Sequence, residues 1–136
     1  MTELTMKHWI DGKEVAEEGA HVIDINSPTT GEVIGGVAAG SVELLKKAID
    51  GARKAQKEWA AMSLAKRTAV MFNFRNLMVE RQDELAAIIV KEGGKTHGDA
   101  LGEIARGLEI VEFACGIHNA LKGDYTSGAS TGIDIH

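Results

Sequence analysis

Several features are scarce in this 136-residue sequence, which contains one cysteine and one proline. A single cysteine excludes an internal disulfide, which fits a reducing compartment. Because proline interrupts helices, its scarcity favours long ones. No apolar run approaches the ~20 residues of a bilayer span, and the N-terminus resembles neither a secretory signal nor a transit peptide. We therefore expect a cytoplasmic protein without a membrane partner.

Positive charge is also in short supply. The chain carries 20 acidic against 15 basic residues, for a net charge of -5. A mildly acidic surface offers no electrostatic reason to bind nucleic acid or anionic lipid. With 44% apolar and 26% charged residues, the composition is that of a folded domain. Glycine, in contrast, is abundant at 16 residues, which indicates tight turns and close packing.

The first forty residues predict strands. The dipeptide Asp11-Gly12 separates two short extended runs at 8–10 and 14–16, and Asp-Gly is a strong hairpin signal because both positions tolerate positive φ. Further extended runs follow at 22–25 and 33–37, on either side of a proline-containing turn. We expect an N-terminal β-hairpin region or small meander.

Three or four helices follow. Ser41 and Ser63 are good N-cap residues, each followed by apolar residues at helical spacing. The second pattern weakens near Gln82, which predicts a break, and then continues to a C-cap at Gly93-Gly94. A further helix is predicted over residues 98–121.

Three glycines interrupt this last helix: Gly102, Gly107 and Gly116. Each costs about 1 kcal/mol relative to alanine, so their presence predicts the close approach of another backbone or a ligand. Beyond the helix, Ile133 and Ile135 alternate with polar residues and predict the start of a strand that is cut at the last residue. The fold class is therefore α+β, with a truncated C-terminal strand.

Two tempting chemical motifs have a structural interpretation. Gly94-Lys95-Thr96 matches the end of a phosphate-binding loop, but the required earlier glycine is Ile89. We interpret it as a helix C-cap followed by a solvent-exposed lysine. Cys115 lies in an apolar helical stripe, so a buried structural cysteine is favoured over a nucleophile. Metal-ligand spacing is absent from the remaining candidates, which we interpret as solvated helix residues: His97, Asp99, Glu103 and His118.

Arg106 is the most informative polar residue. A guanidinium can bind a carboxylate through two parallel hydrogen bonds. From the residues alone, the favoured interpretation is a surface ion pair with Glu103 or Glu109. The dinucleotide-binding pattern Gly-x-Gly-x-x-Gly does not occur in the chain.

Taken in order, five segments resemble aldehyde dehydrogenases. INSPTTGEVIGG resembles the family's "N-P-x-T-G-E-x-I" strand pair, AIDGARKAQKEWA its first helix, and FNFRNLMVERQDELAAIIVKEGGKT its second helix with the following turn. The segment GEIARGLEIVEFACG resembles the third helix in the wording of the CoA-acylating methylmalonate-semialdehyde (malonate-semialdehyde) branch. ASTGIDIH resembles the start of that branch's first oligomerisation strand.

This resemblance has specific implications. It implies that residues 1–122 form the N-terminal hairpin and helical part of a cofactor domain whose Rossmann sheet is absent here, and that residues 123–136 begin an oligomerisation segment. The family's complete enzymes use a cysteine thiolate and NAD, and this branch passes the acyl group to CoA with loss of carbon dioxide, giving propionyl-CoA or acetyl-CoA. A homo-oligomer, dimer or tetramer, is implied for the parent enzyme.

Little of that machinery carries over residue by residue. The family's catalytic cysteine, general base and cofactor-binding turn lie later in its chain, so this chain alone is expected to be inactive and to bind neither NAD nor CoA. The exception is Arg106, which matches an arginine that faces the substrate's free carboxylate in this branch. His118 departs from the family, which usually has proline there; the departure lies at the end of the third helix and concerns no catalytic residue.

Two alternatives stay open. The chain could be a non-enzymatic, truncated relative that pairs with a full-length subunit, because an unpaired strand edge invites a partner. It could also belong to a different branch of the family, one that acts on an aldehyde without a carboxylate.

Overall fold

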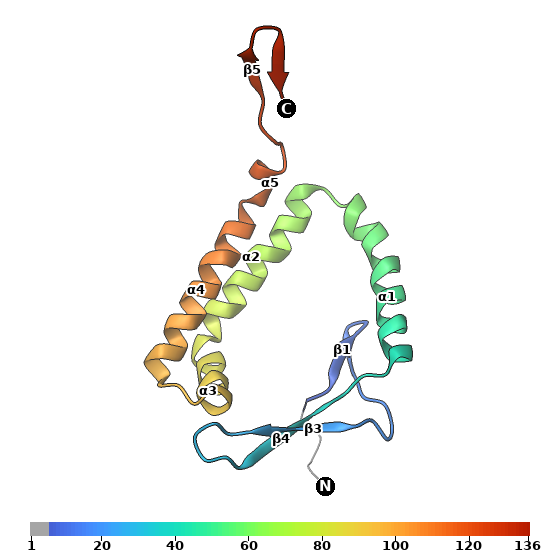
Figure 1. The fold of residues 1–136 in the computed structure, drawn as a ribbon, viewed down its shortest axis with the longest axis vertical. Helices are drawn as coiled ribbons and strands as arrows, with labels where there is room; N and C mark the ends of the chain where they lie inside the picture. The colour runs from blue at the N-terminus through green and yellow to red at the C-terminus, as the bar shows by residue number, and fades with distance from the viewer. Residues whose placement is uncertain (1–5) are drawn as a thin grey trace.

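The computed structural model describes residues 6–136 and confirms the α+β fold class. Within these residues, three separate two-stranded antiparallel sheets accompany five helices. Figure 1 shows helices α2 and α4 running antiparallel along each other, with the β3–β4 hairpin near one end of the pair and the β5–β6 hairpin beyond the other. No sheet closes over the helices among the described residues, so many apolar side chains stay accessible.

The first hairpin forms as its turn residues predict. Strands β1 (His8–Ile10) and β2 (Lys13–Val15) pair antiparallel across Asp11 and Gly12. Both turn residues have positive φ, 52° and 76°, which is the backbone of the type I′ turn that matches the twist of paired strands. The aspartate tolerates this conformation better than most non-glycine residues do.

The second hairpin consists of β3 (Val22–Asn26) and β4 (Val33–Ala38). Its connecting turn is closed by the Gly31 N–H, which donates to the Ser27 carbonyl at 2.8 Å. Pro28 in this turn packs against Gly94, which is far away in the sequence. A Cβ placed on Gly94 would lie only 2.9 Å from the proline Cγ. The contact therefore joins the hairpin to the helical part of the chain.

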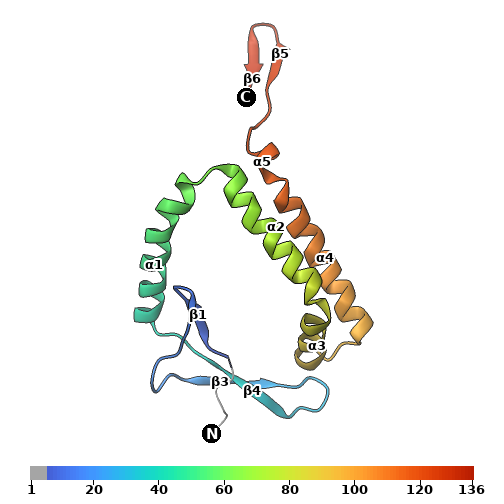
Figure 2. The ribbon, with the colours of Figure 1, turned by 180° about the vertical axis from the view of Figure 1, so that it is seen from behind.

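Helix α1 (Val42–Ala61) begins at Ser41, whose hydroxyl accepts a hydrogen bond from the Leu44 N–H at 3.0 Å. Both ribbon views show α1 apart from the α2–α4 pair (Figures 1 and 2). Most of its apolar stripe is exposed, including 60% of Leu45 and 41% of Trp59. Within the described residues, no further layer covers this apolar face of α1.

The predicted break and caps of the next two helices are confirmed. Helix α2 (Leu64–Glu80) begins after the N-cap Ser63, and α3 (Gln82–Gly93) follows it after a one-residue interruption at Arg81. Helix α3 ends at Gly94, which has φ 65° and donates its N–H to the Val90 carbonyl. Gly94 is thus a left-handed C-cap, a conformation that glycine adopts without steric cost.

The helix predicted over 98–121 divides into α4 (His97–Cys115) and the one-turn α5 (Ile117–Ala120). Gly116 lies between them as the C-cap of α4, and its N–H donates to the Phe113 carbonyl at 3.0 Å. Among the described residues, no other backbone segment closely approaches Gly102 or Gly107, contrary to one half of the expectation. A Cβ on Gly107 would meet nothing within 4 Å, and one on Gly102 would meet only the Arg106 side chain, at 3.7 Å.

The buried core is small and lies where α3 meets α4. Its buried members are Ala86, Ala100 and Ile104, and small side chains at the first two positions let the helices approach closely. Leu85, Ile89, Val90 and Leu101 pack around them. The Arg75 guanidinium also donates to the Glu112 carboxylate at 2.8 Å, joining α2 to α4. Within residues 6–136, each helix is too short or too polar to span a lipid bilayer.

The C-terminal strand is part of a hairpin that the sequence pattern did not reveal. Strand β6 (Ile133–Ile135) pairs antiparallel with β5 (Thr126–Ser130). The Asp134 carboxylate accepts hydrogen bonds from the Gly128 N–H and the Tyr125 hydroxyl, both at 2.8 Å. The hydrogen bond from the Gly128 N–H, and to a smaller extent that from the Tyr125 hydroxyl, lowers the pKa of the Asp134 carboxyl below its ordinary value of 3.8.

Candidate functional site

Arg106 lies in the middle of α4, on a face that is open to solvent. The sequence alone favours an ion pair with Glu103 or Glu109, and that interpretation is wrong for the structure. Among residues 6–136, the guanidinium forms neither a hydrogen bond nor an ion pair. A permanently charged side chain with five donors is thus available to a ligand.

The Arg106 side chain borders a surface groove of about 370 Å³ along the N-terminal half of α4. The groove is lined by Lys95, Gly98, Asp99, Gly102, Glu103 and Arg106. Helical side chains incline toward the N-terminus of their helix, so the guanidinium extends back over Gly102. A Cβ at Gly102 would lie 3.7 Å from Nη1, an ordinary van der Waals distance, so the guanidinium lies close to this glycine.

Both carboxylates in the groove already have partners. Glu103 accepts from the Lys95 ammonium, and both side chains are partly exposed. Asp99 belongs to the N-terminal cap of α4, where its N–H donates to the Thr96 hydroxyl at 3.2 Å and its carboxylate accepts from the same hydroxyl at 2.7 Å. Within the groove, the Arg106 guanidinium is therefore unpaired, whereas the Glu103 and Asp99 carboxylates are bound to Lys95 and Thr96.

The turn before α4 sets this arrangement. Gly94 ends α3, Thr96 caps α4, and Lys95 between them is directed along the new helix to Glu103. Sequence reasoning identified the glycine cap but missed the capping role of Thr96 and the ion pair of Lys95. The spacing Thr-x-x-Asp, typical of a helix start, could have revealed the cap.

The other residues that could suggest chemistry lie apart from the groove. Cys115 is 4% exposed at the end of α4, as expected for a structural cysteine. The His97 Nε2 lies 3.9 Å from the Asp83 carboxylate. In the described part of the chain, no group of three histidine, cysteine or acidic side chains is arranged to hold a metal ion.

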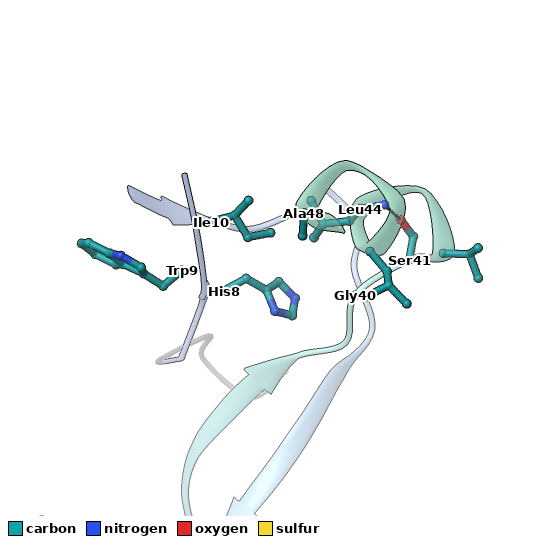
Figure 3. Close-up of a pocket in the computed structure, with 9 residues that line it drawn as sticks. His8, Trp9, Ile10, Gly40, Ser41, Leu44 and Ala48 are labelled. Atoms are coloured by element: carbon teal, nitrogen blue, oxygen red, sulfur yellow. Dashed lines mark hydrogen bonds between the residues drawn. The ribbon is translucent and has the colours of Figure 1, made fainter. Parts of the chain in front are cut away.

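A second cavity, of about 400 Å³, lies between β1 and the start of α1. Figure 3 shows the His8 ring and Ile10 directed toward α1, while Trp9 points to the opposite side of the strand. The His8 Nε2 is buried with no hydrogen-bond partner among the described residues. Nearby, the Ser41 N–H and hydroxyl donate to the Glu17 carboxylate at 2.9 and 2.7 Å, and these hydrogen bonds lower the pKa of Glu17. No pattern in the sequence indicates this cavity.

A dinucleotide site needs a glycine-rich turn between a strand and a helix. In the described residues, the one strand that leads into a helix is β4, and its connection to α1 through Gly40 and Ser41 lacks that pattern. The Ser41 N–H at this helix start is already taken by Glu17. These residues therefore do not fit the phosphates of NAD.

Comparison with known proteins gives a consistent result. The model of the aldehyde dehydrogenase family matches residues 15–135. Malonate-semialdehyde dehydrogenase 1 of Geobacillus kaustophilus is 37% identical over 129 residues, which is 95% of this chain and 26% of that protein. The malonate-semialdehyde dehydrogenase of Pseudomonas aeruginosa is 39% identical over 130 residues, or 96% of this chain and 26% of that protein.

A solved structure agrees with these matches. It is that of a Sinorhizobium meliloti protein described as a methylmalonate-semialdehyde dehydrogenase complexed with NAD, and it superimposes with a TM-score of 0.85 at 41% identity. The match covers 98% of this chain and 28% of that structure. The chain thus spans about a quarter of the length of the relatives that it matches. With the family model matching most of its residues, the chain belongs to the aldehyde dehydrogenase family.

Proposed function

We propose that this chain supplies the N-terminal part of an NAD-dependent, CoA-acylating malonate- or methylmalonate-semialdehyde dehydrogenase. In that reaction the semialdehyde, CoA and NAD⁺ give acetyl-CoA or propionyl-CoA, carbon dioxide and NADH. Residues 1–122 form the hairpin and helical part of the cofactor domain, and residues 123–136 begin an oligomerisation segment. Support comes from the relatives' names and from the β5–β6 hairpin, which projects away from the helices in Figure 1.

The role of Arg106 is the most specific part of this proposal. We assign its guanidinium to the free carboxylate of the semialdehyde. The observation that carries this assignment is the unpaired, exposed guanidinium beside a groove in which both carboxylates have other partners. A planar fork binds a carboxylate through two parallel hydrogen bonds, which fixes the orientation of the aldehyde end as well as adding affinity.

The chemistry itself belongs to the complete enzyme. Cys115 is buried on the α4 helix and unsuited to attack an aldehyde. The 136-residue chain mixed with NAD, CoA and malonate semialdehyde is therefore expected to produce no NADH absorbance. Steady turnover by the purified chain would contradict this part of the proposal.

The assignment of Arg106 is tested in a hybrid enzyme, in which this chain replaces the matching quarter of the Pseudomonas aeruginosa malonate-semialdehyde dehydrogenase. Two substrates are compared: malonate semialdehyde and propanal, which carries a methyl group in place of the carboxylate. A hydrogen bond to a charged group contributes about 1.5–3 kcal/mol. Arg106→Leu should therefore lower kcat/KM for the semialdehyde by about 10- to 150-fold.

The same variant should leave kcat/KM for propanal within about threefold of the parent hybrid, since propanal has no carboxylate to lose. Arg106→Lys is the matched control for charge, because an ammonium keeps the charge but not the fork; an intermediate loss is expected. An unchanged preference for the carboxylated substrate in Arg106→Leu would remove Arg106 from the site.

A further inference from the structure

The availability of Arg106 depends on what its neighbours bind. Glu103 lies three residues earlier on α4, a spacing at which opposite charges on a helix normally pair. The Arg106 side chain inclines toward this N-terminal side, as the proximity of Nη1 to Gly102 shows. Glu103 is thus the carboxylate best placed to occupy the guanidinium, yet it binds Lys95 instead.

Other carboxylates near Arg106 are poor competitors. Asp99, at the far end of the groove, is held by the Thr96 hydroxyl. Glu109 lies three residues later on α4, toward the C-terminus, and does not line the groove. Because the Arg106 guanidinium extends toward the N-terminus of α4, it points away from Glu109. The Lys95–Glu103 ion pair is therefore the contact that decides whether Arg106 has an internal partner.

We propose that Lys95 is a positioning residue: its ammonium holds the Glu103 carboxylate away from Arg106, so that the guanidinium stays free to receive the carboxylate of an anionic aldehyde. This inference rests on the function proposed above. The free carboxylate of the substrate and the Glu103 carboxylate are chemically alike and compete for the same donors. Without Lys95, Glu103 becomes an internal competitor of the substrate.

The expected change in KM on replacing Lys95 follows from the solvent exposure of Glu103 and Arg106. Exposed ion pairs contribute little, and a Glu103–Arg106 pair of ordinary strength would leave Arg106 free for about one-sixth to one-half of the time. Apparent affinity falls in proportion to the free fraction. The Lys95–Glu103 pair is itself partly exposed and of similar strength, so Glu103 is only partly held in the parent. Lys95→Met in the hybrid enzyme should therefore raise KM for malonate semialdehyde about 1.3- to 3.5-fold. The value of kcat should stay unchanged, because saturating substrate displaces Glu103.

The double variant Lys95→Met/Glu103→Gln should restore the parent KM, since the internal competitor is then neutral. Lys95→Arg, which keeps the ion pair, should also behave like the parent. Glu103→Gln alone should leave KM within about twofold, because the carboxylate it removes is already held by Lys95. A simple effect of charge would instead make Lys95→Met raise KM by the same factor in the Glu103→Gln background as in the parent, and that result would overturn the proposal.

Arg81→Gln serves as the matched control. It removes one surface cation from an exposed ion pair with Glu84, at 3.9 Å, and lies outside the groove. Its KM for malonate semialdehyde should equal that of the parent hybrid. With propanal as substrate, Lys95→Met and the parent should have the same KM, since no carboxylate competes.

Different results would refute the assignment of Arg106 and the positioning role of Lys95. If Arg106→Leu impairs use of the semialdehyde while Lys95→Met leaves its KM unchanged, the positioning role is refuted and the proposed function stands. If Arg106→Leu itself has no effect, the assignment of Arg106 is refuted, and the role of Lys95 with it. A rise in KM that Glu103→Gln fails to reverse would also contradict the positioning role.

Discussion

Replacing Gly94 with alanine tests the contact that fixes the turn before α4. Gly94 has φ 65°, a left-handed conformation that costs a residue with a Cβ about 1–2 kcal/mol. The new Cβ would also lie 2.9 Å from the Pro28 Cγ and 3.1 Å from the Thr29 hydroxyl oxygen. Since Pro28 is rigid, the hairpin turn must move, and such overpacking costs about 1–3 kcal/mol. The expected loss of unfolding free energy is about 2–5 kcal/mol.

Two other glycines provide controls for this substitution. Gly12 has φ 76° with nothing within 4 Å of its Cβ position, so Gly12→Ala should show the backbone cost alone, about 1–2 kcal/mol. Gly107 lies within α4 with open space around it, so Gly107→Ala should stabilise the chain by about 0.5–1 kcal/mol. Urea unfolding followed by circular dichroism measures all three. A Gly94→Ala loss no larger than that of Gly12→Ala would refute the packing of the turn against Pro28.

Three further predictions concern other contacts. Thr96→Ala removes the N-cap of α4 and should destabilise the chain by about 1 kcal/mol in urea unfolding, whereas Thr96→Ser should not; equal stability of all three forms would count against the cap. Cys115→Ser places a hydroxyl in a buried, apolar position and should cost about 1–3 kcal/mol, with Cys115→Ala as the apolar control; a serine no worse than alanine would contradict this. The pKa of Glu17 is lowered in the folded chain, so its contact with Ser41 stabilises the fold above the ordinary value of 4.5 and is lost as pH falls through the lowered folded pKa. Glu17→Gln should therefore reduce the acid sensitivity of unfolding in this range, and a pH profile identical to that of the parent chain would show that Glu17 is not responsible.

Much of the fold could be predicted because its signals are local. Ser41 and Ser63 cap helices through hydrogen bonds three residues away, and Asp11-Gly12 forms a turn through its own backbone preferences. The C-cap at Gly94 likewise needs only a positive φ. Each of these features is decided within a few residues, so the sequence pattern predicts it directly.

The features that were missed depend on pairing across the chain or on competition between helix signals. Strand β5 consists of small and polar residues without apolar alternation, and its conformation is set by pairing with β6. Apolar residues at helical spacing continue past Gly116, so the sequence pattern predicted one helix where α4 ends at Cys115. The contact of Pro28 with Gly94 joins residues far apart in the sequence, so no local pattern predicts it.

The candidate site likewise combines a feature that the sequence predicts with one that depends on the three-dimensional structure. Residue type and family resemblance pointed to Arg106, but an arginine three residues after a glutamate favours a surface ion pair. Its availability follows only from the three-dimensional position of Lys95, which takes the Glu103 carboxylate. Sequence reasoning treated this lysine as a solvent-exposed residue, because an ion pair from a turn to the following helix has no fixed spacing.

The most direct test of the account is a crystal structure of the hybrid enzyme with 3-hydroxypropionate, an unreactive alcohol that keeps the carboxylate of malonate semialdehyde. The account predicts that both carboxylate oxygens lie about 2.7–2.9 Å from guanidinium nitrogens of Arg106, as in a bidentate pair. It also predicts that Glu103 stays bound to Lys95. A carboxylate held by other residues, with Arg106 directed away from the ligand, would contradict the assignment.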